Sequence, residues 1–196
     1  MITTSPVRPR EVPIRHHEIL IIGGGIAGTS VAFHLAKNGK KDVAVLERHT
    51  LTSGTTWHAA GLIMQTRGTH ALTEIAKYNA ELYSKLECET GQATGFKRNG
   101  TLGGARTKER LYETARSASI AKSFGLEAHI ISPSEAKRIY PALNESIIEG
   151  AVFIPGDGQT NPVDTCMALA IGAKQKGVKI FENSKVEDLW QTPDGN

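Results

Sequence analysis

A short apolar segment followed by a glycine-rich turn constrains this chain more than any other feature. Residues 19–22 (Ile-Leu-Ile-Ile) predict a short buried strand, and glycines at 23, 25 and 28 then follow the G-x-G-x-x-G spacing. Residues 26–37 predict a helix, and residues 43–46 (Val-Ala-Val-Leu) predict a second strand. Glu47 follows that strand, about 20 residues beyond the last glycine. A strand–turn–helix–strand unit that ends on an acidic residue is the dinucleotide-binding fingerprint.

Each residue type in this unit has a physical role in holding a dinucleotide. The first amides of a helix lack partners within the helix, and the helix dipole is positive there, so a pyrophosphate binds well. Gly23 permits a tight turn, Gly25 lets the pyrophosphate approach the backbone, and Gly28 lets the helix pack closely on the strand. We expect Glu47 to accept hydrogen bonds from the adenosine ribose and to repel the 2′-phosphate of NADP. The alternative is a chance glycine cluster, and the fingerprint alone does not separate FAD from NAD.

The composition is that of one modest globular domain. Of 196 residues, 39% are hydrophobic and 22% are charged, and the net charge is +3. The absence of long basic runs gives no support to nucleic-acid binding, and no apolar run approaches the ~20 residues of a membrane span. Cys88 and Cys166 have neither metal-site nor redox-pair spacing, so we expect two core thiols in a reducing compartment and no metal.

The rest of the chain alternates between helix and strand patterns, with turn residues between them. We expect a flexible, arginine- and proline-containing arm over 1–17, faintly like a mitochondrial presequence, and a polar loop over 49–61. Ser132 and Glu135 form a capping box, and Asn161 precedes a proline at a helix start. The predicted helices are 69–90 with an apolar stripe that includes Leu72 and Ile75, 107–123, 133–140 and 162–177. The predicted strands are 96–105 (or a hairpin about Asn99-Gly100), 128–131, 150–154, 178–181 and 185–190.

This order predicts an α/β fold, Rossmann-like, with an inserted α+β region. The nucleotide-binding domain begins at residue 18 and returns to a strand near residue 178. Asp194-Gly195 is a turn of the kind that connects two hairpin strands. We therefore expect the domain over 18–196 to be incomplete at its C-terminus and the chain to be the N-terminal part of a longer protein.

The loop at residues 53–62 (Ser-Gly-Thr-Thr-Trp-His-Ala-Ala-Gly-Leu) narrows the cofactor. Its small and hydroxyl-bearing residues allow the backbone to approach a ligand. Taken alone, His58 fits best as a hydrogen-bonded loop residue without a catalytic task. The adjacent Trp57 makes the pair unusual for such a loop.

Several segments resemble the sarcosine dehydrogenase and dimethylglycine dehydrogenase family of flavoproteins, over about residues 18–190. The resemblance is carried by Ile-Ile-Gly-Gly-Gly-Ile-Ala-Gly, Leu46-Glu47-Arg48, Thr-Trp-His and Pro155-Gly156-Asp157-Gly158. It implies an FAD-binding domain of the D-amino-acid-oxidase/glutathione-reductase type, in which His58 carries the flavin through a covalent 8α bond. The residues that it implies beside the cofactor are Gly23, Gly24, Gly25, Gly28, Glu47, Arg48, Thr55, Trp57 and His58.

The resemblance also implies a reaction, oxidative N-demethylation of sarcosine or dimethylglycine. A hydride would pass from the N-methyl carbon to flavin N5, and electrons would leave through electron-transferring flavoprotein. The one-carbon unit would pass to tetrahydrofolate in a later domain, in the mitochondrial matrix or the bacterial cytoplasm. We expect the catalytic residues to lie beyond Asn196. We therefore expect residues 1–196 alone to have no enzyme activity. Arg67, His70 and Arg98 are conceivable anion partners, but we expect them to be solvated.

Two other functions remain open. One is a non-catalytic relative, such as a regulatory subunit of pyruvate dehydrogenase phosphatase, which the resemblance implies lacks the Trp-His pair. The other is an ordinary NAD-binding module, against which the same loop and the inserted region weigh. The Trp57-His58 pair therefore favours the enzyme.

Overall fold

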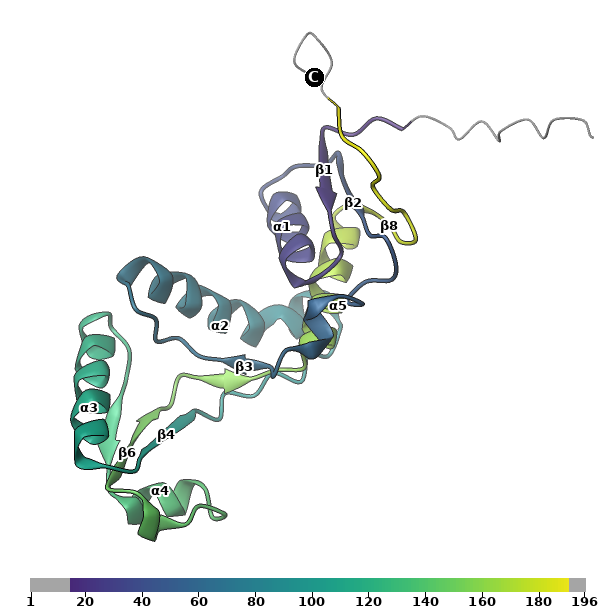
Figure 1. The fold of residues 1–196 in the computed structure, drawn as a ribbon. Coiled ribbons are helices and arrows are strands. Elements are labelled where there is room, and N and C mark those ends of the chain that lie inside the picture. The colour runs from purple at the N-terminus through teal and green to yellow at the C-terminus, as the bar shows by residue number, and fades with distance from the viewer. Residues whose placement is uncertain (1–14, 191–196) are drawn as a thin grey trace, which may run out of the picture.

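A parallel sheet at the start of the fold carries the predicted fingerprint. The computed structural model describes residues 15–190, so most of the predicted arm and the predicted Asp194-Gly195 turn lie outside the described residues. Strands β1 (Ile19–Ile22), β2 (Val43–Leu46) and β8 (Lys179–Phe181) pair in parallel in the order β1-β2-β8. Helix α1 (Ile26–Lys37) connects β1 to β2, and α5 (Pro162–Gln175) precedes β8 (Figure 1). Helical crossovers between parallel strands confirm the predicted Rossmann-like fold.

The main core lies between this sheet and three helices. Phe33 of α1, Leu169 of α5 and Val45 of β2 are fully or almost fully buried there. Leu82 and Leu86 join them from α2 (His70–Thr90), the long helix that extends away from the sheet toward the other end of the molecule (Figure 1). Burial of these side chains stabilises the contact by about 1.5–3 kcal/mol each. The core therefore holds α1, and with it the fingerprint turn, in a fixed place on the sheet.

A second, antiparallel sheet forms the predicted α+β insertion. Its strands are β4 (Thr101–Ala105), β6 (Gly150–Ile154) and β5 (His129–Ile131), in the order β4-β6-β5. Helix α3 (Lys108–Ser123) packs against β6 through a small cluster of buried residues, and the short helix α4 (Pro133–Ile139) contacts the same strand. A two-stranded ribbon of β3 (Leu62–Ile63) and β7 (Gly158–Gln159) links the two regions (Figure 1). The remaining elements are two single-turn 3₁₀ helices, η1 (Thr55–His58) and η2 (Glu145–Ile147).

Side chains cap four of the helix starts, two of which, at Ser132 and Asn161, the sequence predicts. The side chains of Thr69, Thr107, Ser132 and Asn161 each accept a backbone amide of the first helical turn. Ser132 and Glu135 form the complete capping box. Each such cap satisfies an amide that the helix leaves free and contributes about 1 kcal/mol. Two predicted helices therefore begin one residue later than expected, because Thr69 and Thr107 are caps.

Apolar residues of two elements are more exposed than their sequence patterns indicate. Strand β1 is only half buried, since Leu20 and Ile22 are 55% and 57% exposed. Both helices of the parallel sheet lie on one face of it, and within residues 15–190 the other face of β1 is uncovered. On α2, Leu72 and Ile75 are 52% and 58% exposed, because the N-terminal half of that helix extends beyond α1 and α5 (Figure 1).

Three other predictions were corrected. Cys88 is exposed on α2, whereas Cys166 is buried as expected. Residues 185–190 form no strand, because nothing in the described part of the chain pairs with them. The segment 96–105 is a strand only from Thr101, and its partner is β6 rather than a hairpin arm; Gly100, with φ +77°, turns the chain before it. None of the helices in residues 15–190 is both long and apolar enough to cross a membrane.

Candidate functional site

The turn between β1 and α1 has the backbone geometry that the glycine spacing predicts. Gly23 has φ +106°, a conformation that residues with a side chain rarely adopt, and its amide donates to the Leu46 carbonyl at 2.8 Å. A Cβ on Gly28 would lie 1.9 Å from the Gly23 carbonyl oxygen. Only glycine at position 28 therefore allows α1 to begin this close to the end of β1.

The start of α1 offers backbone donors to an anion. Helix α1 begins after Gly25, which makes no side-chain cap, and its first turn holds no acidic residue. Within residues 15–190, the amides of Ala27 and Gly28 donate to no protein group. These free donors and the positive end of the helix dipole fit a pyrophosphate.

Glu47 lies at the C-terminal end of β2 and is held there by two backbone amides. Its Oε2 accepts from the Gly24 amide at 2.7 Å, and its Oε1 accepts from the His49 amide at 2.9 Å. Partial burial opposes ionisation, but the two amides, together with Arg48 and His49, outweigh it and lower the pKa of Glu47. Glu47 is therefore a fixed carboxylate, and each oxygen still has a lone pair for a ribose hydroxyl.

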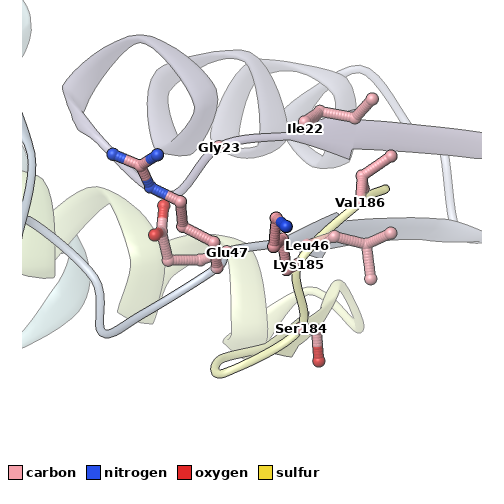
Figure 2. A pocket seen from close by; sticks show the side chains of 8 residues that line it. Ile22, Gly23, Leu46, Glu47, Ser184, Lys185 and Val186 are labelled. Carbon is pink, nitrogen blue, oxygen red and sulfur yellow. The ribbon is translucent and has the colours of Figure 1, made fainter. Parts of the chain in front are cut away.

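A cavity of about 300 Å³ opens beside this carboxylate. Figure 2 shows that it is framed by the ends of β1 and β2 and by the segment that follows β8. Three apolar side chains, Ile22, Leu46 and Val186, line it, and Lys185 contributes a positive charge. The full set of lining residues is Ile22, Gly23, Leu46, Glu47, Arg48, Ser184, Lys185 and Val186. Apolar walls beside a carboxylate suit a flat base joined to a sugar.

A second cavity of about 300 Å³ adjoins the first, because Glu47 and Arg48 line both. Its other walls are the start of α1 (Gly25, Ile26 and Ala27) and residues 53–56. The two cavities thus place an apolar pocket, a carboxylate and a helix N-terminus in sequence. Adenine, ribose and pyrophosphate follow one another in the same order in FAD.

The Thr56 side chain packs closely against Gly25 and the start of α1. A Cβ on Gly25 would lie 3.0 Å from Thr56 Oγ1, and that hydroxyl accepts the Ile26 amide at 2.9 Å. Thr56 is 7% exposed, whereas Thr55 is exposed on the wall of the second cavity. Sequence reasoning missed Thr56, since the repeat Thr55-Thr56 does not indicate which hydroxyl turns inward.

The Trp57-His58 pair occupies the end of η1 and is exposed. The two rings stack at 3.8 Å between centroids, with 35° between their planes, and Trp57 is 57% exposed. His58 Nδ1 lies 3.2 Å from the Gly54 carbonyl oxygen. A carbonyl only accepts, so Nδ1 carries the proton, and in the neutral ring Nε2 has the free lone pair.

The other residues considered as anion partners have local partners. His70 lies 3.8 Å from Glu74, and Arg98 lies 3.5 Å from Glu81. Arg67 donates from Nη1 to its neighbouring carbonyl at 2.9 Å. All three are exposed, and the two cavities described above are lined by none of them.

Three residues of the first cavity were also missed by sequence reasoning, namely Ser184, Lys185 and Val186. They follow β8 and meet Leu46 and Glu47 only because β8 pairs with β2. The amide of Ser184 donates to the Glu47 carbonyl at 2.8 Å, which fixes this approach. A pattern of parallel strands in the sequence could have indicated that β8 ends at the same sheet edge as β2. It could not have indicated which residues after β8 turn back toward Glu47.

Comparisons with known proteins agree with this geometry. The family model described as FAD dependent oxidoreductase (DAO) matches residues 18–196. The chain is 41% identical to human mitochondrial sarcosine dehydrogenase over 87% of this chain and 19% of that protein. It is 40% identical to rat mitochondrial dimethylglycine dehydrogenase over 97% of this chain and 22% of that protein. It is also 38% identical to the mouse mitochondrial pyruvate dehydrogenase phosphatase regulatory subunit, over 86% of this chain and 19% of that protein.

Solved structures share the fold. The L-proline dehydrogenase of P. horikoshii superposes with a TM-score of 0.85 at 33% identity, over 91% of this chain and 47% of that one. The chain therefore spans about a fifth of the length of these curated relatives and about half of that solved structure.

Proposed function

Because this chain belongs to the DAO family of FAD-dependent oxidoreductases, we propose that it forms the FAD-binding part of an amine dehydrogenase acting on CH–NH bonds. The substrate is sarcosine or dimethylglycine, from which the enzyme removes an N-methyl group oxidatively. The similarity to dehydrogenases of both compounds supports this choice. The observation that carries it is the exposed Trp57-His58 turn, attached through Thr56 to the helix that begins the FAD fingerprint.

The residues present fit FAD along the two adjoining cavities. Ile22, Leu46 and Val186 would enclose the adenine, and the Glu47 carboxylate would accept the ribose hydroxyls. The free amides at the start of α1 would hold the pyrophosphate. When bound, FAD supplies the hydride acceptor that no amino-acid side chain provides.

We further propose that His58 holds the flavin covalently. The lone pair on Nε2 makes the neutral ring a nucleophile toward the 8α carbon. His58 would hold the flavin through Nε2 and would remain a neutral, alkylated imidazole.

The remaining parts of the proposed activity concern the whole protein. Electrons would leave through electron-transferring flavoprotein, and the one-carbon unit would pass to tetrahydrofolate bound by a later domain. A mitochondrial matrix location is supported by the names of the sarcosine and dimethylglycine dehydrogenases to which the chain is similar. The bacterial cytoplasm is the alternative.

A non-catalytic role is the second candidate. The chain is 38% identical to a pyruvate dehydrogenase phosphatase regulatory subunit, and this identity is almost as high as the 41% that it shares with a sarcosine dehydrogenase. The two candidates differ in one measurable property, because only the enzyme would reduce its flavin when an N-methyl amino acid is added.

The test uses the full-length protein that contains this sequence. We expect a flavin-fluorescent band after SDS denaturation, and bleaching of the flavin absorbance by sarcosine or dimethylglycine without oxygen. The variant His58→Ala should lose the fluorescent band. The variant His129→Ala, an exposed histidine paired with Glu127, should keep it. Extractable flavin in the wild type would refute the tether, and flavin that neither amine reduces would refute the demethylase and favour the regulatory role.

A further inference from the structure

We propose that Thr56 is the positioning residue for the flavin tether: its hydroxyl attaches the Thr55–His58 turn to the first amide of α1 and so places His58 for bond formation. The inference rests on the proposed function, because it presupposes a bond between His58 and FAD. It concerns a residue beside the tether rather than the tether itself.

The hydrogen bond between Thr56 and α1 joins this turn to the fingerprint helix; the turn also packs against α5, and Thr52 just before it donates to the Gly24 carbonyl at 3.2 Å. Thr56 Oγ1 accepts the Ile26 amide at 2.9 Å, although 30 residues separate the two in sequence. Within residues 15–190, the other hydrogen bonds of residues 54–60 stay inside that segment: His58 to Gly54, and Ala59 to Thr56. Removing the hydroxyl therefore leaves η1 without a hydrogen bond to the fingerprint helix.

The surroundings of Thr56 are shaped around this bond. Glycine at position 25 leaves room beside Oγ1, since a Cβ there would make a tight contact with it at 3.0 Å. Thr56 lines the cavity at the start of α1 and also a separate, mainly apolar cavity of about 150 Å³ on its other side. Ile26, Leu62 and Tyr83 are among the residues that line the 150 Å³ cavity. The Thr56 side chain therefore contributes to the walls of both cavities.

A small displacement of η1 affects the tether more than the binding of FAD. The ring of His58 lies two residues beyond Thr56 in a single 3₁₀ turn, so a shift of Thr56 moves that ring directly. Covalent bond formation depends steeply on the position of the attacking atom, with about 100-fold lost for a displacement near 1 Å. The adenine and ribose contacts, by contrast, are made by β1, β2 and the segment after β8, which Thr56 does not hold.

The experiment measures tether formation and FAD affinity separately in the full-length protein. Flavin-free protein is mixed with FAD in air, and the fluorescent band on SDS gels is followed with time. The dissociation constant is measured by quenching of FAD fluorescence before tethering proceeds. The variants are Thr56→Val, which keeps the shape without the hydroxyl, Thr56→Ser, which keeps the hydroxyl, and Thr50→Val as the matched control, since Thr50 is exposed in the same loop and lines neither FAD cavity.

We expect Thr56→Val to form the tether at least about tenfold more slowly while its FAD dissociation constant changes by less than about threefold. Thr56→Ser and Thr50→Val should match the wild type. If Thr56→Val fails to fold, as judged by circular dichroism, Thr56→Ala takes its place with the same expectation. Wild-type rates in the variants of Thr56 that lack the hydroxyl, or equal slowing by Thr50→Val, would overturn the inference. A wild type that forms no tether would instead refute the proposed function, and the inference with it.

Discussion

Replacing Gly28 by alanine separates the effect of helix propensity from the effect of the tertiary contact. Alanine is better than glycine inside a helix by about 1 kcal/mol, so propensity alone predicts that Gly28→Ala stabilises the protein. The structure predicts the opposite. A Cβ on Gly28 would lie 1.9 Å from the Gly23 carbonyl oxygen and 3.1 Å from its carbon.

The magnitude follows from the atoms that must move. The oxygen in conflict belongs to the backbone of the β1–α1 turn, so no side-chain rotation relieves the contact. The turn and the helix must separate by about 1 Å, and overpacking of this kind costs about 3 kcal/mol, the upper end of its usual range. After the propensity gain of about 1 kcal/mol, the free energy of unfolding falls by about 2 kcal/mol. The unfolding midpoint of the domain that contains this sequence should therefore fall.

Thermal unfolding followed by circular dichroism measures the effect, with Gly68→Ala as the matched control. A Cβ on Gly68 would meet no atom within 4 Å, so that variant should stay within about 0.5 kcal/mol of the wild type. FAD affinity should fall for Gly28→Ala only, because the donor amides at the start of α1 move with the helix. A Gly28→Ala protein as stable as the wild type, with unchanged FAD affinity, would refute the close approach of α1 to β1.

Four further predictions test the site and the fold. Glu47→Gln should weaken FAD binding at least tenfold, from the loss of a charge-assisted acceptor of about 1.5 kcal/mol or more, in a fluorescence titration. The pKa of Glu47 is lowered in the folded protein, so the carboxylate stabilises the fold fully above the ordinary glutamate pKa. This stabilisation is lost as the pH falls through the lowered value. The free energy of unfolding in urea should therefore depend less on pH below about pH 5 in Glu47→Gln than in the wild type. Exposed Cys88 should react with a thiol reagent in the native protein, whereas Cys166, whose pKa burial raises, should react only on unfolding; equal rates would contradict its burial. Ser132→Ala should lower the free energy of unfolding by about 1 kcal/mol, since the capping box with Glu135 is complete, and an unchanged urea midpoint would show that α4 does not depend on its cap.

The sequence predicted local structure well where one short-range interaction decides it. The starts of α4 and α5 follow from Ser132 and Asn161, whose side chains cap the helix within three residues. The end of α2 follows from Gly91, which adopts φ +76°. These features need only neighbouring residues and a backbone preference, so a single sequence contains the information.

Predictions of burial were less successful, because burial depends on the elements that lie opposite. Leu72 and Leu82 belong to one apolar stripe of α2, yet Leu72 is 52% exposed and Leu82 is 5% exposed. Leu82 packs in the core with α1 and α5, whereas beside Leu72 the buried side chains of the helix are Thr73 and Ala76, so the buried face of α2 changes along its length. The predicted strand at 185–190 was wrong for a similar reason, since a strand needs a partner that the described residues do not supply.

The sequence by itself determined the family, the FAD fingerprint and the parallel α/β start of the fold. Glycine spacing, helix caps and an acidic residue after a strand are properties of the local backbone, and local backbone chemistry is encoded residue by residue. Only the tertiary structure decided that Thr56 rather than Thr55 meets α1, and that Val186 and Lys185 reach the pocket of Glu47. Those contacts join residues 30 or more positions apart, and their formation depends on how β8 and the turn at η1 pack against the fingerprint.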